Sequence, residues 1–257
     1  MLENYHTHTT RCRHAVGTEE EYVQQAIAGG LKVLGFSDHT PFRFPGTYYS
    51  HMRMYPEELQ DYVTTVLALK EKYAGQIDIR LGLEVEYYPD RMDALLKLIE
   101  PFGIEYMILG QHWCGNEENE PYNGRPTEDC ALLERYCNQI IEAMDTGLFS
   151  YLAHPDLLNF VGDKKNYRYH MTHLCKEANA REVPLEINLL GLRTGRQYPN
   201  PLFWEIAGET GCPVVIGSDA HTPADVVDPK SEAMAIAIAE KYKLHLLDRI
   251  PIHPWKK

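Results

Sequence analysis

Histidines and carboxylates close the apolar segments of this chain at regular intervals. Seven apolar segments each end in one or two such residues, joined in one case by an asparagine. They are His6 and His8, Asp38 and His39, Glu84 and Glu86, His112, His154, Glu186 and Asn188, and Asp219 and His221. Polar groups that repeatedly end apolar strands are not explained by core packing. Because the carboxyl ends of barrel strands meet at one mouth, we expect these side chains to gather around one site.

The spacing within two of these pairs suits metal coordination. Residues two apart on a strand project from the same face, so His6 and His8 can reach one ion, and Asp219 and His221 can reach adjacent ions. A lone His-x-His pair is more often an ordinary surface or buried structural feature. The further imidazoles and carboxylates favour a metal site instead, with ligands that suit zinc, manganese or iron. A carboxylate such as Glu84 can bridge two of these ions.

The apolar segments themselves predict buried parallel strands with helices between them. They cover residues 4–8, 31–38, 77–87, 104–112, 148–154, 183–190 and 212–219. Helical spacing separates the strands, as in residues 55–73, where Leu59, Val63 and Val66 recur at helical intervals and Pro56 and Gly75 bracket the helix. About seven repeats of strand and helix without a linker predict an α/β fold, a single-domain (β/α) barrel over residues 1–257.

The composition restricts the partners of the chain. The formal net charge of -12 argues against general affinity for nucleic acid or anionic membranes, which reward basic surfaces. The six cysteines are scattered, nothing resembles a signal peptide, and no segment is long enough to span a membrane, so we expect a cytoplasmic protein. A phosphorylated substrate would have to be met by bound cations and a few arginines.

Several longer motifs resemble a known family. They are YHTHT at 5–9 with His14 soon after, GFSDH at 35–39, GLEVEYYP at 82–89, ILGQHW at 108–113, AHPDLL at 153–158, EINLLGLR at 186–193 and IGSDAHTPADV at 216–226. Together they are similar to the polymerase-and-histidinol-phosphatase (PHP) superfamily, and most like its histidinol-phosphatase branch. The resemblance covers nearly the whole chain and implies a distorted seven-stranded (β/α)7 barrel.

The same resemblance implies a site with two or three divalent ions. The first ion would be held by His6, His8, Glu84 and Asp219, the second by Glu84, His112 and His154, and the third by His14, His39 and His221. The implied activity is hydrolysis of a small phosphorylated metabolite, foremost L-histidinol phosphate. A water between the ions that share Glu84 would attack phosphorus directly, and Asp219, His221 or a metal-bound water would protonate the leaving alkoxide.

Arginines are the expected phosphate contacts, because a guanidinium matches two phosphate oxygens. Arg193 and Arg196 come first, since GLRTGRQYP directly follows a strand end and resembles the substrate loop of the family. Arg43 and Arg53 are second choices. Each of them can equally be a solvated surface charge. Five tyrosines are candidate pocket residues: Tyr48, Tyr49, Tyr87, Tyr88 and Tyr122.

Two departures from the family leave the leaving group open. Leu189 and Leu190 stand where relatives commonly carry small hydroxyl residues, and Leu158 and Asn159 stand where they often carry a basic residue. Two alternatives therefore remain. One is a phosphoesterase for another small phosphomonoester or a phosphodiester, and the other is a non-catalytic metal-binding module. The sequence decides neither the native metal nor the oligomeric state.

Overall fold

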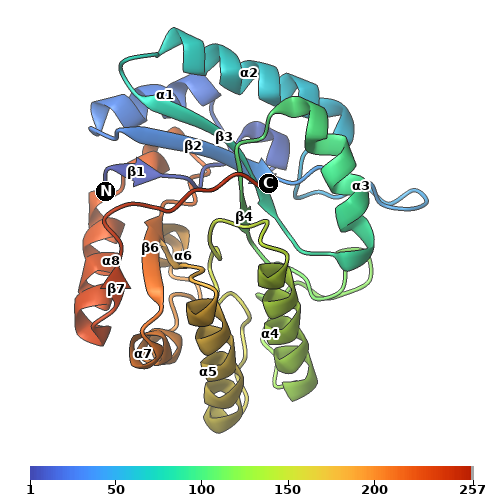
Figure 1. The fold of residues 1–257 in the computed structure, drawn as a ribbon, viewed down its shortest axis with the longest axis vertical. Helices are drawn as coiled ribbons and strands as arrows, with labels where there is room; N and C mark the ends of the chain where they lie inside the picture. Colours follow the sequence, from blue (N-terminus) through green and yellow to red (C-terminus); the bar gives the residue numbers. More distant parts are fainter. Residues whose placement is uncertain (256–257) are drawn as a thin grey trace.

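Seven strands form two parallel sheets in the computed structural model, which describes residues 1–255. The strands are β1 (Glu3–Asn4), β2 (Val33–His39), β3 (Asp78–Val85), β4 (Tyr106–Leu109), β5 (Leu185–Asn188), β6 (Pro213–Gly217) and β7 (His245–Leu246). One sheet has the order β1-β2-β3-β4 and the other β5-β6-β7, and every pairing is parallel. The strands curl around a common centre with the helices outside them (Figure 1).

Single β-bridges join the two sheets at both of their edges. Leu152 bridges to Leu109 on one side and to Leu185 on the other, and Thr7 bridges to Ala220. The second seam is reinforced where Ser218 donates its backbone N–H to Asn4 Oδ1 at 3.0 Å. The α/β class and the curled parallel sheet agree with the sequence prediction.

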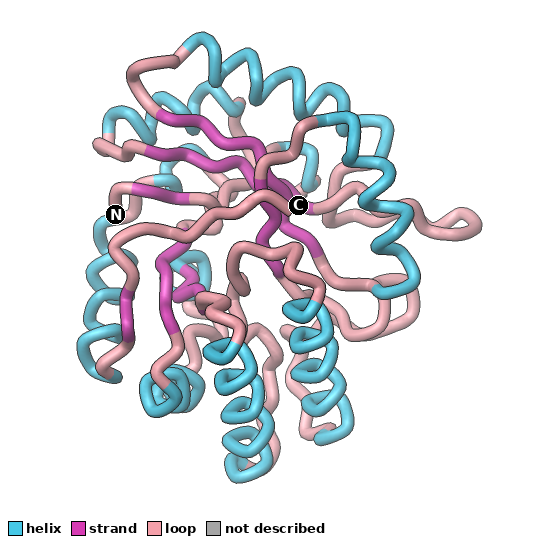
Figure 2. The backbone as a smooth tube through the Cα atoms, in the orientation of Figure 1, coloured by secondary structure: helices cyan, strands magenta, loops and turns pink. Residues whose placement is uncertain are grey.

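Seven strands were predicted and seven are present, but they differ from the predicted set at two places. The strand expected over 148–154 is reduced to the bridge at Leu152, because the chain turns at His154, where φ is +30°, and Pro155 follows. β7 was not predicted, since two residues carry no period. Figure 2 shows how much of the chain between these short strands is loop.

Eight α-helices and four short 3-10 helices occur in residues 1–255. The α-helices are α1 (Glu19–Ala28), α2 (Leu59–Lys72), α3 (Pro89–Ile99), α4 (Cys130–Asp145), α5 (Lys164–Ala180), α6 (Leu189–Thr194), α7 (Pro201–Thr210) and α8 (Pro229–Tyr242). The 3-10 helices are η1 (Thr10–Cys12), η2 (Pro56–Glu58), η3 (Glu100–Phe102) and η4 (Pro223–Val226). The helix predicted after Pro56 is confirmed as η2 and α2. None of these helices is long and apolar enough to cross a membrane.

Side-chain oxygens cap several of these helices at their first turn. Asp129, Asp163 and Asn200 accept backbone N–H bonds at the starts of α4, α5 and α7, and Thr18 forms a capping box with Glu21 at α1. Such caps satisfy donors that have no partner within the helix.

A small apolar cluster fills the centre of the curled sheet. It contains Tyr5, Tyr106, Ile108, Tyr151, Ala153 and Val215. The segment that follows β7 crosses the amino ends of the strands toward β4 and packs Leu247, Ile250 and Ile252 on this cluster (Figure 1). His253 Nε2 lies 3.0 Å from the backbone oxygen of Phe149, and Trp255 Nε1 donates to that of Ile104 at 2.8 Å. This segment thereby covers the curled sheets at the amino ends of their strands, and the carboxyl ends stay free for a site.

Candidate metal centre

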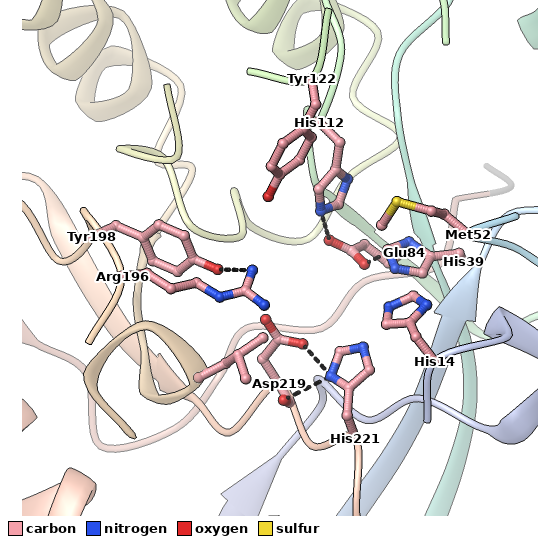
Figure 3. Close-up of a pocket in the computed structure, with 11 residues that line it drawn as sticks. His14, His39, Met52, Glu84, His112, Tyr122, Arg196, Tyr198, Asp219 and His221 are labelled. Carbon is pink, nitrogen blue, oxygen red and sulfur yellow. Dashed lines mark hydrogen bonds and ion pairs between the residues drawn. The ribbon is translucent and has the colours of Figure 1, made fainter. Parts of the chain in front are cut away.

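All nine residues expected to bind metal lie together at the carboxyl ends of the strands. His6 and His8 follow β1, His14 follows η1, His39 ends β2, Glu84 lies in β3, His112 follows β4, His154 follows the Leu152 bridge, and Asp219 and His221 follow β6. Six of them line a cavity of about 270 Å³: His14, His39, Glu84, His112, Asp219 and His221 (Figure 3). His6, His8 and His154 are buried beneath it.

Glu84 lies between two groups of imidazoles. Its Oε1 is 2.9 Å from His154 Nε2 and 3.8 Å from His112 Nε2. Its Oε2 faces the other group, 3.0 Å from His39 Nδ1, 3.4 Å from His8 Nε2 and 3.6 Å from His6 Nε2. A carboxylate with one oxygen toward each group has the arrangement required to bridge two ions.

Two further ligand groups form around Asp219 and His221. Asp219 Oδ1 lies 3.2 Å from His8 Nε2 and 3.6 Å from His6 Nε2. On the outer side, one ligand atom each of His14, His39 and His221 falls within 4.8 Å of the others. The His14 and His221 rings stack with centroids 4.6 Å apart. The structure thus brings together the three ligand groups that the sequence resemblance implied.

Outward hydrogen bonds orient the imidazoles. His6 Nδ1 lies 2.8 Å from Glu186 Oε1, and His112 Nδ1 lies 3.0 Å from Glu86 Oε1. His14 Nδ1 contacts the backbone oxygen of Cys12 at 2.7 Å. Such contacts place the proton on Nδ1 and turn Nε2 inward, as is usual for histidines that bind metal. Asp38 accepts the backbone N–H of His39 at 2.8 Å and lies 3.4 Å from His8 Nδ1.

Several inward atoms are buried without a hydrogen-bond partner in the described chain. They are Nε2 of His6, His8 and His221, Nδ1 of His39, Oε2 of Glu84 and Oδ1 of Asp219. Buried polar atoms normally have partners, and a group of unpartnered nitrogens and carboxylate oxygens facing one another is the donor set of divalent transition ions. The residues present therefore fit the metal ions that the sequence implied.

The electrostatics of the cluster point the same way. Burial would raise the pKa of the Glu84 carboxyl, but the imidazoles of His39, His112 and His6 hold that pKa well below its usual value. Burial lowers the pKa of His8, yet hydrogen bonds to Asp219 and Asp38 outweigh it and raise that pKa to about 9. The buried carboxylates thus draw positive charge into the site, and bound cations supply it without protonating the ligands.

Backbone conformations at two ligands are uncommon for residues with a side chain. His154 has φ of +30° and Asp219 has φ of +47°. Positive φ is uncommon in non-glycine residues and persists where the surrounding structure holds it. Two glycines make room for buried carboxylates, because a Cβ on Gly110 would lie 1.9 Å from Glu84 Oε1 and one on Gly217 would lie 1.8 Å from Glu186 Oε1.

The predicted phosphate contacts separate clearly in the structure. Arg196 lines the cavity, where its Nη1 donates to Tyr198 Oη at 3.2 Å, and no carboxylate within residues 1–255 pairs with it (Figure 3). Arg193 does not line the cavity. Its Nη2 donates to the backbone oxygens of Ser218 and Asp219 at 2.8 and 3.0 Å, and Asp225 and Asp228 pair with it.

The second-choice arginines also have other partners. Arg43 is exposed outside this cavity and lies 3.1 Å from Glu57. Arg53 is fully buried between Glu86 and Glu117. Carboxylates thus pair with Arg193, Arg43 and Arg53, and the cavity position of Arg196 makes it the better-placed candidate, while a phosphate contact of the others stays a prediction.

Other cavity residues were partly anticipated. Of the five candidate tyrosines only Tyr122 lines the cavity, while Met52 and Tyr198 line it without having been predicted. Leu190 forms part of the wall, but Leu189 is buried in the core. Met52 and Tyr198 lie in loops between strands, where no periodicity indicates which side chains turn inward.

The sequence of this chain matches known proteins over most of its length. The PHP domain profile matches residues 4–189. The chain belongs to the PHP family. It is 34% identical over 227 residues to the probable histidinol-phosphatase of Deinococcus radiodurans, with 86% of each chain covered. It is 27% identical over 255 residues to the histidinol-phosphatase of Bacillus subtilis, covering 86% of this chain and 94% of that one.

A solved structure shares the fold of this PHP-family chain. The histidinol phosphate phosphatase of Lactococcus lactis, crystallised with zinc, L-histidinol and phosphate, matches with a TM-score of 0.74 at 18% identity. The match covers 100% of this chain and 98% of the other. At this identity the likeness concerns the fold.

Proposed function

We propose that this chain is a metal-dependent phosphomonoesterase that hydrolyses L-histidinol phosphate to L-histidinol and phosphate. The observation that carries the proposal is Glu84, with one carboxylate oxygen toward His112 and His154 and the other toward His6, His8 and His39. The relatives named histidinol-phosphatase support the substrate.

The metal assignment follows the three ligand groups. We assign a first ion to His6, His8, Glu84 and Asp219, a second to Glu84, His112 and His154, and a third to His14, His39 and His221. The proposed ions are zinc, manganese or iron, which accept this mixture of imidazole and carboxylate ligands. The fold that presents the ligands is proposed to be a single-domain distorted (β/α)7 barrel, closed through the bridges at Leu152 and Thr7.

Divalent ions bound there supply Lewis acidity, lowering the pKa of water and offsetting charge on the phosphoryl oxygens. Arg196 binds a non-bridging phosphate oxygen, since it lines the cavity and forms no salt bridge with a carboxylate of residues 1–255. Tyr122 and Tyr198 line the same cavity, and their hydroxyls can donate to the phosphate.

Proton transfer to the leaving group is assigned to the Asp219 and His221 pair. His221 Nδ1 lies 3.2 Å from the backbone oxygen of Asp219, which fixes the ring while its Nε2 is left without a hydrogen-bond partner in the described part of the chain. With Nε2 given to the third ion and Nδ1 to this backbone oxygen, the ring would orient Asp219, and the Asp219 carboxylate is the member of the pair that would relay a proton to the departing oxygen.

The decisive experiment compares two substrates with the metal-loaded protein. Histidinol phosphate should exceed p-nitrophenyl phosphate in kcat/KM by at least about a hundredfold, because specificity requires the leaving group to add binding in the transition state. Release of free phosphate is the readout. Equal rates would reject the histidinol assignment, and no hydrolysis of any monoester would reject the phosphomonoesterase.

One observation favours a second candidate, a phosphatase for another small phosphomonoester. Met52 and Leu190 give the cavity apolar wall where a polar leaving group would need partners. A pocket without such partners discriminates poorly between substrates of similar size. A screen of phosphorylated metabolites would identify that substrate.

A further inference from the structure

Arg53 is one of the largest fully buried side chains of the protein, and every direction of its guanidinium is occupied. Nη1 and Nη2 donate to the two oxygens of Glu86 at 2.8 and 2.9 Å. Nε and Nη2 donate to Glu117 Oε2 at 2.8 and 2.5 Å, and Nη1 reaches the backbone oxygen of Thr40 at 3.3 Å. Arg53, Glu86 and Glu117 have side-chain exposures of 1%, 1% and 3%, so the group is closed to water.

The three residues come from separate segments of the chain. Arg53 lies in the irregular segment between β2 and η2, Glu86 directly follows β3, and Glu117 lies in the segment between β4 and α4. Burying three charges has a large desolvation cost, and ion pairs seldom return it as stability compared with apolar residues. The geometry therefore calls for a role beyond core packing.

The contacts of the group lead directly to the metal centre. Glu86 Oε1, which Arg53 Nη2 binds, lies 3.0 Å from His112 Nδ1. Without Arg53, this carboxylate would be free to rotate away from the imidazole. The residue before Arg53 is Met52, and Tyr122 lies five residues after Glu117; both line the cavity. The guanidinium thus connects one metal ligand with two walls of the substrate cavity.

We propose that Arg53 is a positioning residue: through Glu86 it fixes His112 for the second ion, and through Glu117 it holds the two cavity-lining segments together. The role concerns the metal centre of the proposed function and rests on it. The contact with Glu86 and the contact with Glu117 can be tested separately, because Glu117 has no hydrogen bond to His112 and instead accepts one from Tyr48 Oη at 2.9 Å.

Loss of the Glu86 contact and loss of the Glu117 contact should have different effects. In Glu86→Gln the carboxylate partner of His112 is lost, and supporting partners of metal-bound histidines typically contribute about 10-fold to 100-fold in metal affinity. In Glu117→Gln the Arg53 and Glu86 pair stays intact, so metal affinity should change by less than about threefold while KM rises. Arg53→Lys keeps the charge but loses the fork that grips both carboxylates, so it should show both effects.

The experiment measures metal binding without substrate. Each purified variant is titrated with zinc against a chromophoric chelator to resolve its binding steps, and KM and kcat are measured afterwards at saturating zinc. Arg168→Lys serves as the matched control, because Arg168 also pairs with two carboxylates, Glu205 and Glu209, on the exposed surface of α5 and α7. Circular dichroism establishes that each variant is folded.

The expected result is one weakened step in Glu86→Gln and Arg53→Lys, with unchanged binding in Glu117→Gln and the control. Wild-type affinity at every step in folded Glu86→Gln would overturn the proposal. Equal loss of metal affinity in Glu117→Gln would also overturn it, because the effect would then not pass through Glu86. If Arg53→Lys does not fold, the two glutamine variants decide. Because zinc titration requires no turnover, failure of the histidinol assignment would leave this result standing.

Discussion

Replacing Arg196 with alanine tests the proposed phosphate site most directly. In the described chain this guanidinium donates to Tyr198 Oη at 3.2 Å and is exposed at the cavity. Its removal should therefore cost less than about 1 kcal/mol of folding free energy. The main effect should appear when phosphate is bound.

The size of that effect follows from the surroundings of Arg196. A hydrogen bond to a charged group contributes about 1.5 to 3 kcal/mol, and solvent exposure lowers this range to about 1 to 2 kcal/mol. Arg196→Ala should thus decrease kcat/KM by about 5-fold to 30-fold. Inhibition by inorganic phosphate should weaken as well, and Arg196→Lys should recover only part, because an ammonium lacks the planar fork.

The assay measures kcat/KM for histidinol phosphate and the inhibition constant of phosphate, with Arg193→Ala alongside. Arg193 binds the backbone oxygens of Ser218 and Asp219, so its loss should lower metal content and thermal stability while phosphate affinity of fully loaded protein changes little. The reasoning would be refuted if Arg196→Ala keeps wild-type values, or if Arg193→Ala alone weakens phosphate inhibition in metal-saturated protein.

Three further predictions concern the metal centre and the segment after β7, which packs on the central apolar cluster. Elemental analysis of the purified protein should find two to three divalent ions per chain, since nine ligands exceed the needs of one tetrahedral site, and one ion or fewer would contradict the assignment. Glu84→Gln should lose metal and decrease turnover by about a thousandfold or more. The control Glu20→Gln, in an exposed ion pair with Lys72, should behave as wild type. A fully active Glu84→Gln would mean that another residue bridges the ions. Ile250→Ala should decrease the free energy of unfolding by about 1 to 2 kcal/mol, because Ile250 packs on the central cluster. Ile236→Ala, at an exposed position, should not decrease it. Equal melting curves of the two variants would refute the packing role of the segment after β7.

The ligand cluster was predictable because its signal is local. His6, His39, Glu84, His112 and Asp219 lie in or directly after strands, and the carboxyl ends of parallel strands must converge. The alternation of strand side chains does not extend to Asp219 and His221, because they lie beyond β6 and Asp219 has φ of +47°. No comparable rule acts on loops, which is why Met52 and Tyr198 were not anticipated as cavity residues.

The arginines show where sequence reasoning fails. Arg193 and Arg196 are three residues apart in one motif, yet only Arg196 lines the cavity. The difference is made by Asp225 and Asp228, which approach Arg193 from a distant segment. Arg53 likewise acquires its role from partners 33 and 64 residues away. Pairings of this kind depend on the tertiary fold and leave no period in the sequence.

The seam at Thr7 and Ala220 gives the proposed ions a mechanical role. There the segment after β1 meets the segment after β6 through one bridge and a few hydrogen bonds, among them Ser218 Oγ to the backbone oxygen of His6, 212 residues apart. His6 and His8 lie on one side of the seam, and Asp219 and His221 on the other. An ion between them would be a reversible cross-link that closes a very long loop, where such links restrict the unfolded chain most. Chelation should then separate the two sheets first along this seam. Scarcity of metal in a cell would therefore expose the segments at the seam to proteases.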